Sequence, residues 1–109
     1  TRGATRDGRT HMIVQHRQNE TGGEFFVENE GDAEGEALAE LSYEIDRARG
    51  QMVIRHTRVD DALRGRGVGG KLVEAAAKRA YAQGLKVKPV CAFARAVFDK
   101  TPEFDAVRA

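Results

Sequence analysis

The sequence predicts an α+β fold, an α/β sandwich in which helices pack on one mixed sheet. Three observations predict it: several strand-like segments in the first half of the chain, one long amphipathic helix after a glycine-rich turn, and a further strand and helix beyond it. The length of 109 residues fits one domain. A composition of 40% hydrophobic and 32% charged residues is typical of a globular chain.

The first eleven residues (TRGATRDGRTH) differ from the rest of the chain. They lack apolar periodicity, and they end at a His-Met junction of the kind that a cloning site leaves behind. We interpret residues 1–11 as an expression-tag remnant or a flexible leader, and residues 12–109 as the domain. No apolar run is long enough to span a bilayer, and we expect a cytoplasmic protein.

Four segments in the first half have strand-like patterns: Met12–His16, Glu24–Glu28, Glu36–Ile45 and Gln51–Val59. Polar or glycine-containing turns are predicted between them, at 19–23, 31–35 and 46–50. Apolar residues at alternate positions give the third segment one buried face. In the fourth segment, we expect Met52, Ile54 and His56 to share a face, because side chains alternate along a strand.

The second half alternates helix and strand. Apolar residues repeat at every fourth position over Gly67–Gln83, which predicts a helix with one buried stripe, ended by Gly84. Leu85–Cys91 follows as a strand. Ala92–Lys100 is predicted to be a shorter helix, which Pro102 ends.

The charge balance and the single cysteine exclude several classes of function. Lys and Arg number 18 and Asp and Glu number 17, which leaves a net charge of +1 and no basic excess for a nucleic-acid binder. One cysteine (Cys91) allows no internal disulfide and no cysteine-rich metal site. Three scattered histidines do not indicate a metal centre either.

A glycine-rich turn before the long helix carries the clearest chemical signal. Backbone N–H groups in such a turn, together with the positive end of the helix dipole, form an anion site suited to phosphate or pyrophosphate. The residues expected at this site are Arg64, Gly65, Arg66, Gly67, Val68, Gly69, Gly70 and Lys71.

Two familiar motifs overlap this turn and fit poorly. Gly65, Gly67 and Gly70 spell the GxGxxG of dinucleotide-binding folds, but no acidic ribose ligand follows the next strand. Gly65 to Lys71 also spells GxxxxGK, but Leu72 stands where a P-loop needs Ser or Thr to hold Mg²⁺.

A third motif, [Q/R]-x-x-G-x-[G/A], is met by Arg64, Gly67 and Gly69. Here the sequence resembles the GNAT-type N-acetyltransferase superfamily, and in particular a minimal, short-chain branch of it. Further segments match that branch in order and spacing: His56–Val59, Lys88–Cys91, Phe98 and Pro102–Phe104. The resemblance covers about residues 25–107.

The resemblance implies a mixed, mostly antiparallel sheet in which a β-meander precedes a β-α-β-α unit. It implies acetyl-CoA as cofactor, with the glycine-rich turn around its pyrophosphate and its pantetheine arm between two splayed strands. These strands would be Gln51–Val59 and Leu85–Cys91, and Pro89 is suited to a place where strand pairing fails. A backbone N–H near Arg58 or Val59 would bind the oxyanion. The implied activity is acetyl transfer to an amine, either a protein lysine or a small amine; the alternative is a non-catalytic acetyl-CoA or CoA-binding module.

Cys91 and His56 are the candidate catalytic residues. Cys91 would accept the acetyl group as a thiolate or act as an acid; alternatively, it is a small buried hydrophobe. His56 would act as a general base or an activator of Cys91, since an imidazole can exchange protons near neutral pH; alternatively, it is a hydrogen-bonded core residue. His11 and His16 have no comparable context, and we expect them to be exposed.

Two further groups have both a structural and a functional interpretation. We expect three phenylalanines in the core (Phe93, Phe98 and Phe104), with Phe98 also flanking the pantetheine arm. Acidic residues in the early turns form a solvated face or attract a cationic substrate: Glu28, Glu30, Asp32, Glu34 and Glu36. Residues 31–35 leave room only for a tight turn where full-sized relatives have helices. The acceptor site is therefore expected to be shallow, open or completed by a second subunit.

Overall fold

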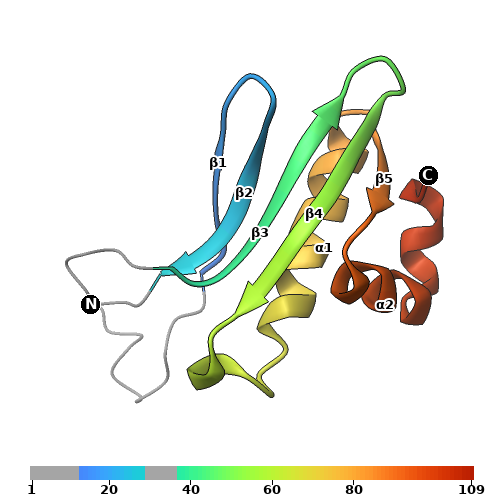
Figure 1. Ribbon diagram of the computed structural model, residues 1–109. Helices are drawn as coiled ribbons and strands as arrows, with labels where there is room; N and C mark the ends of the chain where they lie inside the picture. The colour runs from blue at the N-terminus through green and yellow to red at the C-terminus, as the bar shows by residue number, and fades with distance from the viewer. Residues whose placement is uncertain (1–12, 29–36) are drawn as a thin grey trace.

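Figure 1 shows a computed structural model of the chain, which describes residues 13–28 and 37–109. Its strands form a five-stranded sheet in sequence order: β1 (Gln15–Gln18), β2 (Gly22–Glu28), β3 (Ala37–Asp46), β4 (Gln51–Val59) and β5 (Lys86–Pro89). Neighbours from β1 to β4 are antiparallel, and β5 runs parallel to β4. The mixed, mostly antiparallel sheet and the α+β class predicted from the sequence are confirmed.

The helices follow the second half of the sheet. The elements are η2 (Asp61–Leu63), α1 (Val68–Ala82), α2 (Ala92–Lys100) and η3 (Pro102–Val107), where η denotes a 3-10 helix. Helix α1 lies against one face of the sheet, and α2 and η3 lie beside β5 (Figure 1). The helix α2 and strand β4 have the bounds that the sequence predicts, and α1 differs by one residue at each end.

The core lies between α1 and the sheet face that it covers. Leu72, Val73 and Ala76 of α1 are completely buried, as are Leu41 of β3 and Ile54 of β4. The alternation predicted for the third strand is confirmed, because its buried residues recur at every second position. Packing against the sheet, rather than helix propensity alone, therefore stabilises α1.

The first hairpin is tighter than predicted. The Asn19 side chain accepts hydrogen bonds from the N–H groups of Thr21 and Gly22, at 2.9 and 3.0 Å. This local turn lets β2 begin at Gly22 and shifts β1 to Gln15–Gln18, whereas the sequence predicted a strand over Met12–His16. Residues 1–11 and the predicted turn at 31–35, with most of the acidic residues near it, lie outside the described residues.

Within residues 13–28 and 37–109, no helix is long and apolar enough to cross a membrane. The same residues include no group of three or more His, Cys, Asp or Glu side chains placed to hold a metal ion.

Candidate active site

Strands β4 and β5 separate partway along their length. Their paired positions run from Gln51 and Lys86 to Ile54 and Pro89. Proline has no N–H to donate, so the ladder ends there. The next two N–H groups, of Val90 and Cys91, both donate to the carbonyl of Ile54, at 3.0 and 3.2 Å. Beyond Ile54, β4 continues to Val59 with β3 as its paired neighbour, and its other edge borders a gap.

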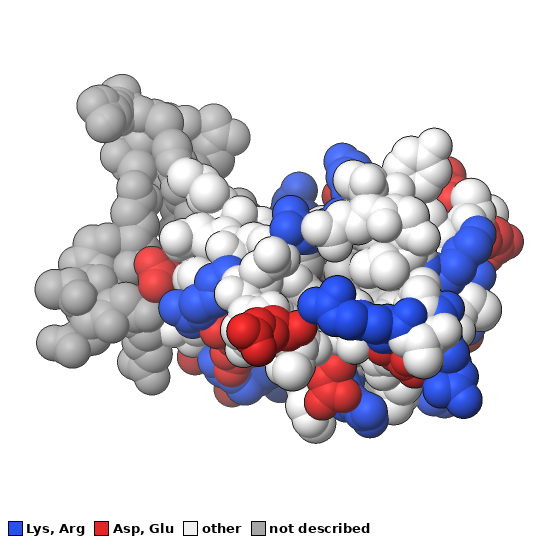
Figure 2. Space-filling view, turned by 90° about the horizontal axis from the view of Figure 1, so that it is seen from above, with Lys and Arg blue, Asp and Glu red and all other residues white. Residues whose placement is uncertain are grey.

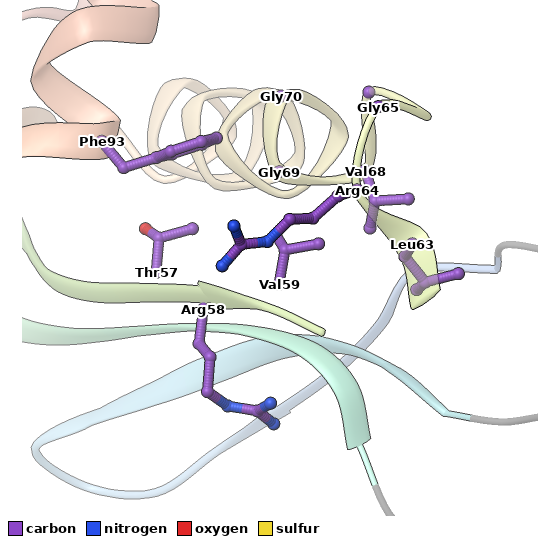
Figure 3. Close-up of a pocket in the computed structure, with 11 residues that line it drawn as sticks. Thr57, Arg58, Val59, Leu63, Arg64, Gly65, Val68, Gly69, Gly70 and Phe93 are labelled. Carbon is purple, nitrogen blue, oxygen red and sulfur yellow. The ribbon is translucent and has the colours of Figure 1, made fainter. Parts of the chain in front are cut away.

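A β-bulge in β4 reverses the direction of its side chains at the same place. Ser42 pairs with His56 and Tyr43 pairs with Ile54, so Arg55 is an extra residue on β4. After the bulge, Thr57 and Val59 point toward α1 (Figure 3), and His56 lies on the opposite face. The prediction that His56 shares a face with Met52 and Ile54 is therefore wrong.

The glycine-rich turn borders the gap and leads into α1. Gly65 and Gly67 have φ values of 81° and 74°, which a residue with a Cβ rarely adopts. Gly67 is the N-cap of α1, and no side chain caps the helix, so its first N–H groups and its dipole face the turn. The Arg64 guanidinium extends into the space between β4 and α1 (Figure 3) and contacts Asp61 at 3.0 Å.

A groove of about 630 Å³ lies between this turn and β4. It is lined by Thr57, Arg58, Val59, Leu63, Arg64, Gly65, Gly67, Val68, Gly69, Gly70 and Phe93. Most residues of the predicted cofactor site are thus brought together. Arg66 and Lys71 are exposed and lie outside this lining. Arg58 reaches the groove from its backbone, because its side chain points away to Glu40 and the carbonyl of Ala37, at 3.1 and 2.9 Å.

The aromatic residue at the groove is Phe93, and the prediction that Phe98 flanks the cofactor does not agree with its position. Phe98 is 1% exposed and packs on Phe104 in the core, with ring centroids 5.1 Å apart. Phe93 is 43% exposed, and its ring extends from α2 toward α1 (Figure 3). The two residues lie about 140° apart around the helix. Helical periodicity could have distinguished the two residues in the sequence. Phe98 lies four positions after Ala94, and these two residues form the buried side of α2.

A second cavity of about 610 Å³ holds both candidate catalytic residues. It is lined by Glu24, Glu40, Ser42, His56, Thr57, Arg58, Cys91, Ala92 and Phe93. Three of these residues, Thr57, Arg58 and Phe93, also line the groove. Two cavities thus meet at one junction, with the glycine-rich turn at one end and Cys91 at the other.

Cys91 lies just beyond β5 and is the N-cap of α2 rather than a strand residue. Its sulfur accepts a hydrogen bond from the N–H of Ala94 at 3.4 Å and lies 3.3 Å from Oγ1 of Thr57. The sulfur thus caps the first turn of α2. His56 lines the same cavity, but the side chain that contacts the sulfur is that of Thr57.

Charged residues around the second cavity are paired. Arg17 contacts Glu24 at 2.6 Å, and Arg58 contacts Glu40 at 3.1 Å. On the face shown in Figure 2, basic and acidic side chains are interspersed rather than gathered in one basic patch. This arrangement agrees with the balanced charge of the sequence.

His16 is not exposed as predicted. Its Nε2 lies 2.6 Å from Oη of Tyr43, and its ring stacks on Phe25 with centroids 4.3 Å apart. Burial, and then the positive charge of Arg79, lower the pKa of His16 below the ordinary value. This cluster lies on β1, β2 and β3, and its three rings line neither cavity.

Comparisons with known proteins agree with this geometry. A sequence model of the GCN5-related N-acetyltransferase family matches residues 24–107. No curated protein gives a significant sequence match to this chain. Among solved structures, a proposed GCN5-like N-acetyltransferase from Staphylococcus aureus is 32% identical, with a TM-score of 0.65 over 87% of each chain.

A second solved structure, an IAA acetyltransferase from Bacillus cereus, shares the fold at 16% identity. Its TM-score is 0.60, over 81% of this chain and 73% of the other. The match to the family model over most of the chain, and the first structure at 32% identity, are the findings that assign a family. This chain belongs to the GCN5-related N-acetyltransferase family, whose chemistry is acyl transfer.

Proposed function

We propose that the chain binds acetyl-CoA in the groove between β4 and α1 and transfers the acetyl group to an amine that enters the second cavity. The observation that carries this proposal is that the two cavities share three lining residues, with the glycine-rich turn lining one cavity and Cys91 lining the other. The family generally uses acetyl-CoA as its acyl donor. The acceptor is either a protein lysine or a small amine.

The residues of the groove fit such a donor. The uncapped start of α1, with Arg64 beside it, suits the pyrophosphate. Within residues 13–28 and 37–109, the backbone of β4 beyond Ile54 has no strand partner on the β5 side, and this edge offers hydrogen bonds to the amides of a pantetheine arm. When bound, acetyl-CoA supplies an activated acetyl thioester. The residues expected to hold it are Arg64, Gly65, Gly67, Val68, Gly69 and Gly70, with the backbone of Arg58 and Val59.

The second cavity supplies groups that can move protons. His56 is exposed there and is suited to take a proton from an incoming ammonium group. Cys91 either receives the acetyl group on its sulfur or donates a proton to the leaving thiolate. A backbone N–H near Arg58 or Val59 is the proposed oxyanion donor. The amine would enter from the sheet face opposite α1, where His56 lies.

The test combines calorimetric titration with acetyl-CoA and CoA and the intact mass of the protein. We expect saturable binding that is lost in Gly67→Glu. Gly84→Glu is the matched control, because Gly84 has nearly the same φ (72° against 74°) and similarly open space but lies at the far end of α1. A mass increase of one acetyl group that disappears in Cys91→Ser, which retains a side chain able to cap α2, indicates the covalent route.

The outcomes separate an enzyme from a binding module. Acetylation of an amine such as a lysine peptide or a polyamine, abolished by His56→Ala while CoA binding persists, supports catalysis. Binding without transfer to any amine contradicts the catalytic proposal and favours a non-catalytic CoA-binding module. Absence of binding in the unmodified chain overturns both.

A further inference from the structure

Phe93 differs in exposure from the other phenylalanine of its helix. It is 43% exposed, although Phe98 on the same helix is completely buried. Its ring lies at the junction of the two cavities and lines both of them, above Thr57 (Figure 3). A ligand that reaches from the glycine-rich turn to Cys91 must pass this ring.

The ring is held against α1 at Gly69. A Cβ placed on Gly69 would lie 2.3 Å from Cζ and 2.7 Å from Cε1 of Phe93, far closer than atoms can approach. By contrast, a Cβ on the neighbouring Gly70 would meet nothing within 4 Å. A side chain at position 69 would therefore displace the Phe93 ring, so Gly69 allows the ring to lie against α1 in addition to the phosphate-binding role predicted from the sequence.

We propose that Phe93 is a positioning residue for the acyl-CoA arm: seated on Gly69, its ring packs on the part of the ligand that joins the phosphates to the sulfur. This inference rests on the proposed function and deepens it. The ring is apolar and donates no hydrogen bond, so it contributes through burial of apolar surface. It therefore acts on the arm and not on the phosphates, which contact the turn beyond it.

Calorimetry with two probes tests this division. CoA contains the arm, and ADP contains only the nucleotide and its phosphates. We expect Phe93→Ala to weaken CoA binding about tenfold or more, with ADP binding changed less than about twofold, and we expect Phe93→Leu to retain most of the affinity. Tyr81→Ala removes another exposed ring, 75% exposed on α1, and should leave both affinities unchanged.

Gly69→Ala provides the second test. The added methyl group displaces the ring, so CoA binding should weaken in the original chain but not further in a Phe93→Ala background. Gly70→Ala is the control for this substitution, because a methyl group at position 70 meets nothing within 4 Å. Its ADP affinity measures the effect of a methyl group at the start of α1 that does not touch the ring.

Equal loss of CoA and ADP affinity in Phe93→Ala, or no loss of either, overturns the proposal. So does a Gly69→Ala effect on CoA binding that is the same in both backgrounds. If the unmodified chain binds neither probe, the proposed function itself fails, and that result is obtained before any variant is made. In transfer assays, a positioning role predicts a raised KM for acetyl-CoA in Phe93→Ala, with a smaller change in kcat.

Discussion

The two halves of β4 share β3 as the paired neighbour on one edge, but β5 pairs with the first half and not with the second. Residues 51–54 pair with β3 and β5, and Met52 and Ile54 are completely buried. Among the residues that the structure describes, 56–59 pair with β3 alone, Arg55 is the bulged residue, and His56 and Arg58 are exposed. Two local features separate the halves: the bulge at Arg55 and the proline at position 89 of the adjacent strand.

This difference shows how one short strand serves two purposes. In the first half, every side of the strand is used for packing and pairing, so substitutions there should change stability. In the second half, the free edge and the exposed side chains border the cavities, so substitutions there should change binding and chemistry. The predictions below test this separation, beginning with the largest effect.

The largest effect is expected in the second half. His56→Ala should lower the rate of acetyl transfer by about 10²–10⁴-fold, because this is the contribution of a positioned general base. Its melting temperature should stay close to that of the unmodified chain, since the side chain is exposed. Arg55→Ala is the neighbouring control: it removes only a surface ion pair with Glu44 and should leave the rate unchanged. A His56→Ala protein with full activity would contradict the separation.

In the first half, Ile54→Ala should destabilise the fold by about 2–5 kcal/mol, because it leaves a cavity in a site that is 0% exposed. Urea unfolding measures this loss. Any fall in activity should follow the folded fraction, so the rate per folded molecule should be retained. Val90→Ala removes a half-exposed apolar side chain beside the split and should change stability by about 0.5 kcal/mol or less. Equal destabilisation by both substitutions would show that the first half is not specially important to the core.

The sequence predicted the order of the elements, the bounds of β4 and α2 and the place of the glycine-rich turn. Those features depend on local patterns: alternation, helical periodicity and glycine content. The bulge at Arg55 could not be predicted in this way, because it arises from the register between β3 and β4. It reversed the predicted direction of His56.

The same limit explains the errors at Phe93 and His16. The sequence shows that both residues are aromatic, but not what lies against them. Phe93 extends over Gly69 of another helix, and His16 contacts Tyr43, two strands away in the sheet. Such contacts join residues that are distant in sequence, so no local pattern contains them.

A smaller effect is expected where the strand meets Cys91. Thr57→Val keeps the shape of the side chain but removes the hydroxyl that lies 3.3 Å from the sulfur. Loss of one such hydrogen bond costs about 0.5–1.5 kcal/mol, so transfer should slow about threefold to tenfold. The rate at which iodoacetamide alkylates Cys91, measured by mass spectrometry, reports the reactivity of the thiol directly. This rate should also change in Thr57→Val. Unchanged alkylation and transfer rates would show that Thr57 only packs against Cys91.

The smallest effect concerns pH and lies outside both halves of β4. Since the pKa of His16 is lowered in the folded chain, the unfolded chain takes up its proton first as the pH falls through 6.5. His16 therefore contributes to a loss of folding stability on acidification, and this contribution is absent above pH 6.5. His16→Gln does not titrate, so its stability should fall less between about pH 7.5 and about pH 5.5. Urea midpoints at the two values measure the difference. A His16→Gln chain whose urea midpoint falls as much as that of the unmodified chain between these two pH values would contradict this contribution of His16.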